Sequence, residues 1–170
     1  MARAPDALWP RWIFLRALGL IFFSAFYSLA FQIHGLIGRR GILPVAEYLG
    51  RAASVVPGIK RLWYVPSVLW LGSSDRALTA VIALGIICSL LVVVNVWPKL
   101  NLIACTILFL SCVVTLQDFS SYQSDGMLLE AGLISIYFAP RGVWPGLGAA
   151  DPPSSISLFM LRWEWFRIYF

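Results

Sequence analysis

Residues 77–97 read ALTAVIALGIICSLLVVVNVW and contain no charged side chain. As an α-helix this stretch is about 31 Å long, which matches the roughly 30 Å hydrocarbon core of a bilayer. The composition of the whole chain agrees, because 60% of its 170 residues are hydrophobic and 12% are charged. A soluble domain is about 45–50% apolar and about 25% charged. The sequence therefore predicts a polytopic membrane protein.

Further apolar runs on both sides of this stretch predict an all-α transmembrane helix bundle. We expect a single membrane domain over residues 1–170, with about four full spans and a partial fifth. The spans are expected at about 13–33, 77–97, 100–117, 119–139 and, for the partial one, 156–170. The last run is short of a full crossing and has no polar tail. This predicts a truncated chain, or one that partners complete.

The longest connection contains an interfacial segment, residues 44–71, which is apolar in places but too broken to span. Pro44 is suited to the first position of a helix. Four residues after it recur at helical spacing: Val45, Tyr48, Leu49 and Ala52. The pattern predicts a short amphipathic helix at the membrane interface, followed by an interfacial or re-entrant stretch.

The basic residues lie between the apolar runs, where they anchor spans at lipid headgroups. No basic face is interleaved with exposed aromatic residues, so the net charge of +5 does not indicate nucleic-acid binding. We expect Arg39 and Arg40 to contact lipid phosphates, because each basic residue near an anionic surface contributes about 1 kcal/mol. The orientation in the membrane is left open. The count of basic residues favours a cytoplasmic first loop, but this argument is weaker if the loop lies in the interface.

The sequence predicts neither a cofactor nor a metal site. His34 is the one histidine, and its place beside a glycine at a span end favours an interfacial role. Cys88, Cys105 and Cys112 all lie in apolar runs and are interpreted as buried thiols. The chain has no Ser-His-Asp arrangement, phosphate-binding glycine loop or zinc-protease helix. We therefore predict no catalytic residue.

Polar side chains stand at or inside the leading end of the apolar run 121–140. A carboxylate in hydrocarbon costs several kcal/mol, so such residues are usually paired or functional. We predict an intramembrane polar site in which these acids face arginines of neighbouring spans and bind a lipid headgroup or a client segment. Its candidate residues are Glu130, Asp125, Gln123, Arg16, Arg162 and Arg167.

Structural interpretations account for the same residues. The charges would then form ion pairs that fix the register of the helices, or lie at the interface. Asp125 also suits the N-cap of the fourth span, because a carboxylate there accepts from backbone N–H groups.

Four sequence motifs occur in an informative order and spacing. They are Phe-Leu-Arg-Ala-Leu-Gly-Leu-Ile (14–21), Gln-Ile-His-Gly-Leu-Ile-Gly-Arg-Arg-Gly-Ile-Leu-Pro (32–44), Tyr-Gln-Ser-Asp-Gly-Met-Leu-Leu-Glu-Ala-Gly (122–132) and Leu-Arg-Trp-Glu-Trp-Phe-Arg (161–167). Together they resemble the lipase maturation factor family, and the third motif is the most specific. The resemblance covers essentially the whole chain, but only the amino-terminal part of the family's longer membrane region.

The resemblance implies an integral membrane protein, in the endoplasmic reticulum of animals or the cytoplasmic membrane of bacteria. Animal members help secreted lipases to fold and assemble into active dimers. The family is also distantly similar to the membrane region of vitamin K-dependent carboxylases. Its maturation activity is usually placed in a part that this chain lacks.

Three classes of function follow. The resemblance favours a chaperone that assists a client, and the short chain favours a non-catalytic accessory subunit of a larger membrane complex. A carboxylase-like enzyme is the third class, with Glu130 as its base. Expected partners are membrane lipids, together with other membrane subunits or a lipase-like client.

Overall fold

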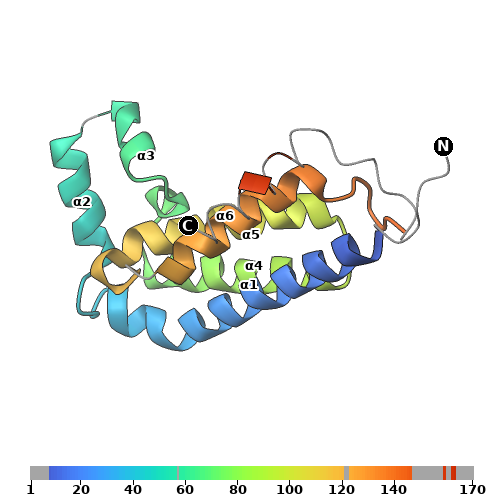
Figure 1. Ribbon diagram of the computed structural model, residues 1–170. Helices are drawn as coiled ribbons and strands as arrows, with labels where there is room; N and C mark the ends of the chain where they lie inside the picture. Colours follow the sequence, from blue (N-terminus) through green and yellow to red (C-terminus); the bar gives the residue numbers. More distant parts are fainter. Residues whose placement is uncertain (1–7, 57, 121–122, 147–158, 160–161, 164–170) are drawn as a thin grey trace.

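A computed structural model describes residues 8–56, 58–120, 123–146, 159, 162 and 163. All regular elements in this part of the chain are helices, as predicted. Four long helices pack into a bundle in which successive members run in opposite directions (Figure 1). They are α1 (Leu8–Ile37), α4 (Asp75–Val93), α5 (Pro98–Leu116) and α6 (Gln123–Phe138).

Among the described residues, three helical stretches are long and apolar enough to cross a membrane: Trp9–Ile37, Asp75–Val93 and Pro98–Ser120. The third of these includes the short 3-10 helix η4 (Gln117–Ser120) after α5. α6 has 16 residues, which is about 24 Å by helical rise, and it begins later than the predicted 119–139 span. The predicted partial span at 156–170 lies outside the described residues except for 159, 162 and 163.

The second span ends earlier than the sequence predicts. α4 stops at Val93, and Asn95 (φ 65°) and Trp97 (φ 40°) then reverse the chain through left-handed backbone conformations. Pro98 opens α5 at a position where its missing N–H is not needed. The turn is held from a distant loop, because the Asn95 side-chain amide donates to the Pro145 carbonyl at 2.6 Å.

An aromatic cluster joins α1, α4 and α5 at the centre of the bundle. Phe22 and Phe26 of α1 are fully buried and meet the ring of Phe109 of α5 edge-on, with centroids 5.9 and 5.8 Å apart. A Cβ on Gly85 of α4 would lie 2.5 Å from the Phe26 ring. α4 therefore approaches α1 this closely only because residue 85 is glycine.

α6 docks on the bundle through a second close contact. A Cβ on Gly132 would lie 2.6 Å from Oγ1 of Thr106 and 2.9 Å from the Phe22 ring. The Thr106 hydroxyl donates to the Leu102 carbonyl at 2.8 Å, so it is already engaged. In a bilayer the hydrophobic effect does not drive helices together. Small residues at such contacts let the helices approach closely, so that van der Waals packing stabilises them. Gly132 thus sets where α6 lies against α1 and α5.

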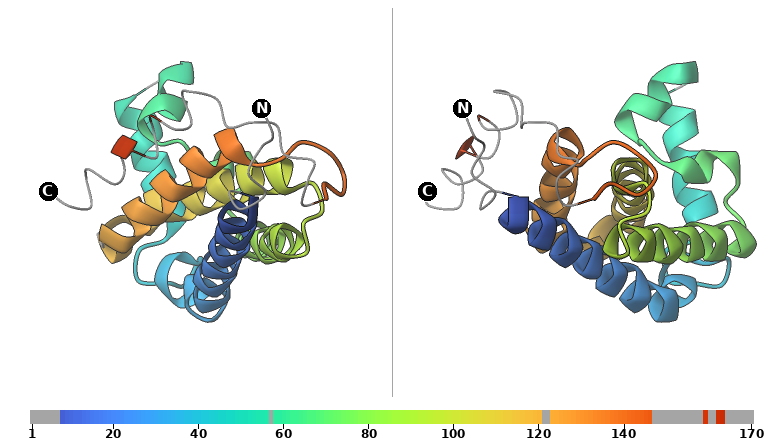
Figure 2. Two further views of the ribbon diagram at one scale, coloured as in Figure 1. Left: turned by 45° about the vertical axis from the view of Figure 1, so that its right-hand side comes forward. Right: turned by 90° about the vertical axis from the view of Figure 1, so that its right-hand side faces the viewer.

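The segment between α1 and α4 forms a separate layer at one end of the bundle. It contains α2 (Val45–Val55), η2 (Gly58–Lys60), α3 (Arg61–Tyr64) and η3 (Val68–Leu71), together called the cap segment below. α2 and α3 stand across the long axis of the bundle (Figures 1 and 2). The predicted amphipathic helix is present as α2, and its Val45 and Leu49 are buried. Its apolar face therefore packs on protein.

Candidate interfacial site

The candidate site lies at the end of the bundle that carries the cap segment. Two hydrogen bonds join the end of α1 to the beginning of α4 there. Nε2 of His34 lies 3.0 Å from Oγ1 of Thr79, and the backbone N–H of Arg39 donates to Oδ1 of Asp75 at 2.9 Å. A carboxylate in the first turn of α4 is also favoured by the helix dipole. These contacts fix the chain where it leaves the membrane-spanning part of α1.

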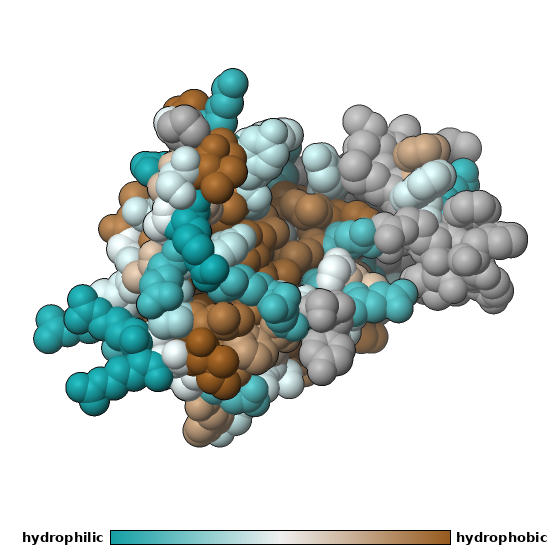
Figure 3. All heavy atoms as spheres, turned by 90° about the vertical axis from the view of Figure 1, so that its left-hand side faces the viewer, coloured by the Kyte–Doolittle hydropathy of each residue, from teal (hydrophilic) through white to brown (hydrophobic). Residues whose placement is uncertain are grey.

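Basic side chains gather at this end. All of them are exposed, and Figure 3, which faces this end, shows hydrophilic side chains projecting beside hydrophobic surface. They are Arg39, Arg40, Arg51, Lys60, Arg61 and Arg76. Arg61 also stacks its guanidinium on the Trp70 ring, 4.7 Å from the centroid. The predicted lipid-contacting pair, Arg39 and Arg40, is thus part of a larger cationic surface.

The cap segment also exposes large apolar side chains. Ile59, Trp63 and Leu71 are 83%, 87% and 91% exposed, and Tyr64 is 70% exposed. Aromatic and apolar side chains mixed with Lys and Arg are typical of protein surface at the level of lipid headgroups. The interfacial position of residues 44–71 stays a prediction, for which this surface offers side chains of the suitable kinds.

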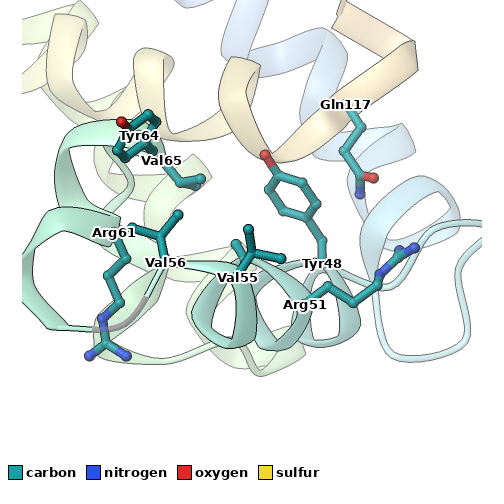
Figure 4. Close-up of a pocket in the computed structure, with 9 residues that line it drawn as sticks. Tyr48, Arg51, Val55, Val56, Arg61, Tyr64, Val65 and Gln117 are labelled. Carbon is teal, nitrogen blue, oxygen red and sulfur yellow. The ribbon is translucent and has the colours of Figure 1, made fainter.

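A pocket of about 390 Å³ opens between α2, α3 and the end of α5. Figure 4 shows Val55, Val56 and Val65 along it, Tyr48 on the α2 side and Gln117 beyond the end of α5. The guanidinium of Arg51 extends toward the side occupied by Gln117, and that of Arg61 points away. The pocket therefore combines an apolar lining with polar groups at its edge.

Gln117 is the most unusual residue of this pocket. Its φ of 53° and ψ of −119° are those of the first central residue of a type II′ turn, a position that glycine dominates. A non-glycine residue held in such a conformation costs about 1–3 kcal/mol and often marks a functional site. The side-chain Nε2 is buried and has no hydrogen-bond partner among the described residues. A buried donor of this kind is normally satisfied, so the amide calls for an acceptor.

Of the predicted intramembrane residues, the structure describes all but Arg167. Gln123 is exposed and Asp125 half-exposed in the first turn of α6. α6 begins toward the end of the bundle that carries the cap segment (Figure 1). α6 begins at Gln123, so the predicted N-cap role of Asp125 is wrong and its carboxylate lies inside the first turn. Glu130 is half-exposed one and a half turns further along. Arg162 is exposed, and Arg167 lies outside the described residues.

Arg16 lies toward the opposite end of the bundle. Phe22 and Gly132 are in contact, and α1 and α6 run in opposite directions. Arg16 is therefore about 9 Å of helical rise to one side of this contact, and Asp125 about 10 Å to the other. The Arg16 guanidinium stacks on Trp12, 3.3 Å from the ring centroid, and donates to the Trp12 carbonyl at 3.0 Å. Arg16 and Asp125 are thus not brought together.

Sequence reasoning missed the pocket and Gln117. Gln117 follows the apolar run of α5, which places a polar residue at a span end, but no sequence signal reveals its backbone conformation. The described residues contain no group of three or more His, Cys, Asp and Glu placed to hold a metal ion. The cysteines are free thiols, with Cys105 and Cys112 buried as predicted and Cys88 half-buried.

The chain is similar to vertebrate membrane proteins along almost its whole length. A family model described as the lipase maturation factor transmembrane domain matches residues 9–170. Lipase maturation factor 2 of Gallus gallus is 32% identical over 173 residues, covering 95% of this chain and 23% of that protein. Lipase maturation factor 1 of Bos taurus is 32% identical over 165 residues, covering 93% and 29%. The chain thus spans about a quarter of these relatives, and no solved structure matches it.

Proposed function

Because this chain belongs to the lipase maturation factor family, we propose that it assists the folding or assembly of a lipase-like client at a membrane. The observation that carries the proposal is similarity over 93–95% of the chain to proteins named for lipase maturation. The chain is an integral membrane protein, and the described residues contain three helices of spanning length. We place it in the endoplasmic reticulum membrane if its cell is eukaryotic, and in the cytoplasmic membrane if it is bacterial.

We assign the chain a holding role without chemistry of its own. In support, the end of the bundle with the cap segment offers binding surface: exposed cations, exposed aromatic residues and a pocket. The exposed side chains of Arg39 and Arg40 are proposed to contact lipid phosphates. The hydrogen bond from the Arg39 backbone to Asp75 holds this part of the chain at the end of the bundle. Gln123 and Asp125 begin α6 near the same end, where they are proposed to contact lipid or client.

The test is a maturation assay in cells that secrete a lipase and lack their own maturation factor. The chain is expressed in them, and lipase activity per mass of secreted lipase is measured together with capture of lipase on the chain in mild detergent. We expect both to rise, and both to fall again in Gly132→Leu, because a leucine there prevents α6 from docking.

Unchanged specific activity with no lipase captured would contradict the proposal. Membrane proteins captured in fixed stoichiometry instead of lipase would favour the accessory-subunit function.

A further inference from the structure

We propose that the pocket between the cap segment and the end of α5 binds one anionic phospholipid through its phosphate. This is a ligand site distinct from client binding, and it does not rest on the maturation role. Four features carry it: the depth of the pocket in the membrane, the unsatisfied amide of Gln117, the charge at the edge and the apolar lining.

The depth follows from the helix that precedes the pocket. α5 has 19 residues, which is about 28 Å by helical rise and close to the thickness of the hydrocarbon core. Gln117 is the first residue after α5 and lines the pocket. The pocket therefore lies at the hydrocarbon boundary, where the glycerol and phosphate groups of lipids are found.

The amide of Gln117 defines the chemistry of the ligand. Its Nε2 donates to none of the described residues and is shielded from solvent. A turn of the side chain toward the pocket lets it donate to a ligand, so the matching group is an acceptor oxygen, such as that of a phosphate or an ester. The strained backbone of Gln117 holds the side chain at this position. Arg51 extends to the same side of the pocket and is exposed (Figure 4). A guanidinium recognises phosphate with two parallel N–H donors, which favours an anion over a neutral acceptor.

The lining accounts for the rest of a lipid. Val55, Val56 and Val65 line the pocket, and Val55 is 79% exposed. A volume of about 390 Å³ is within the range of ligand sites and accommodates a headgroup with its glycerol. The acyl chains then continue past Val55 and the exposed Tyr64 into the bilayer. A free phosphate ester would fill the polar edge and leave this apolar surface uncovered.

The test is native mass spectrometry of the purified chain released from detergent. The chain is titrated with phosphatidylglycerol, with phosphatidylcholine and with glycerol 3-phosphate. We expect one phosphatidylglycerol per chain, bound at least fivefold more tightly than phosphatidylcholine, and no binding of glycerol 3-phosphate at the same concentration. Gln117→Leu and Arg51→Gln should each weaken phosphatidylglycerol binding about tenfold. The matched controls, Gln32→Leu on exposed α1 surface and Arg141→Gln at the other end of the bundle, should leave it unchanged.

A third variant keeps the polar groups and fills the pocket. Ala52→Phe adds a ring to its lining and should abolish binding while the elution volume of the chain stays unchanged. Equal phosphatidylglycerol affinity in the wild type, the pocket variants and the controls would overturn the proposal. Binding of glycerol 3-phosphate as tight as that of phosphatidylglycerol would also overturn it, because the ligand would then be a free phosphate ester.

Discussion

Replacement of Gly132 by alanine adds one methyl group at the contact that positions α6. The new Cβ would lie 2.6 Å from Oγ1 of Thr106, about 0.8 Å closer than the 3.4 Å at which ordinary van der Waals contact begins. Thr106 cannot turn away freely, because its hydroxyl is bonded to the Leu102 carbonyl and a β-branched side chain has few rotamers. The Phe22 ring on the other side is fully buried. Relief therefore requires α6 to move outward.

Overpacking of this kind costs about 1–3 kcal/mol. For a chain of this size, a loss of about 2 kcal/mol corresponds to a fall in Tm of about 5 °C. The assay is thermal unfolding of the purified chain in mild detergent. Gly126→Ala is the matched control, since it lies on the same helix and a Cβ there meets nothing within 4 Å. Alanine at position 126 should leave Tm unchanged or raise it slightly, because glycine is a poor helix former.

Equal Tm values for the two variants would refute the docking of α6 through Gly132. A fall in Gly126→Ala larger than that in Gly132→Ala would refute it more strongly, because the packed and the open face of α6 would then be exchanged.

Three further predictions concern other parts of the molecule. Gln117→Gly should raise the free energy of unfolding by about 1 kcal/mol, because glycine adopts the positive φ without strain. The affinity for phosphatidylglycerol should fall in the same variant. A change of stability and affinity in the same direction would contradict the strain argument. Asn95→Ala should lower the free energy of unfolding by about 2 kcal/mol, through loss of the bond to Pro145 and of a residue that tolerates the left-handed conformation. Limited proteolysis should then cut residues 141–146 faster than in wild type, and an unchanged cleavage rate would argue against this tether. Glu130→Gln should weaken assembly in detergent more than Glu47→Gln in α2, because we propose that Glu130 is paired within the bundle; equal thermal stability of the two variants would exclude this pairing.

The sequence predicted the helical membrane architecture because apolar runs of spanning length are a strong signal. The amphipathic helix after Pro44 was predicted from the spacing of Val45 and Leu49, and both side chains are buried in the structure. Periodicity identifies the buried face of a helix, but it does not say what covers that face. The covering of α2 by the bundle was therefore not predicted.

The parts that sequence reasoning missed depend on contacts between residues far apart in the chain. Charge complementarity suggested that Arg16 faces an acid, but its guanidinium stacks on Trp12 and donates to the Trp12 carbonyl, one helical turn away. α4 ends earlier than the predicted span, which continued to Trp97. The turn that follows α4 is held by a loop 50 residues later, through the hydrogen bond from Asn95 to Pro145. The sequence does not reveal the backbone conformation of Gln117. Glycine is the residue expected at its positive φ, and glutamine at this position gives no such signal.

The measurement that tests this account most directly is the depth of two exposed residues in a bilayer. Spin labels are placed at Leu84 on α4 and at Trp63 in the cap segment, in a chain with Cys88, Cys105 and Cys112 replaced by alanine, and the accessibility of each label to oxygen and to a water-soluble nickel complex is compared. The bundle with an interfacial cap predicts that Leu84 is reached by oxygen and shielded from nickel, whereas Trp63 lies at headgroup depth. Equal depths for the two labels, or a Trp63 label as open to nickel as a label in bulk water, would contradict it.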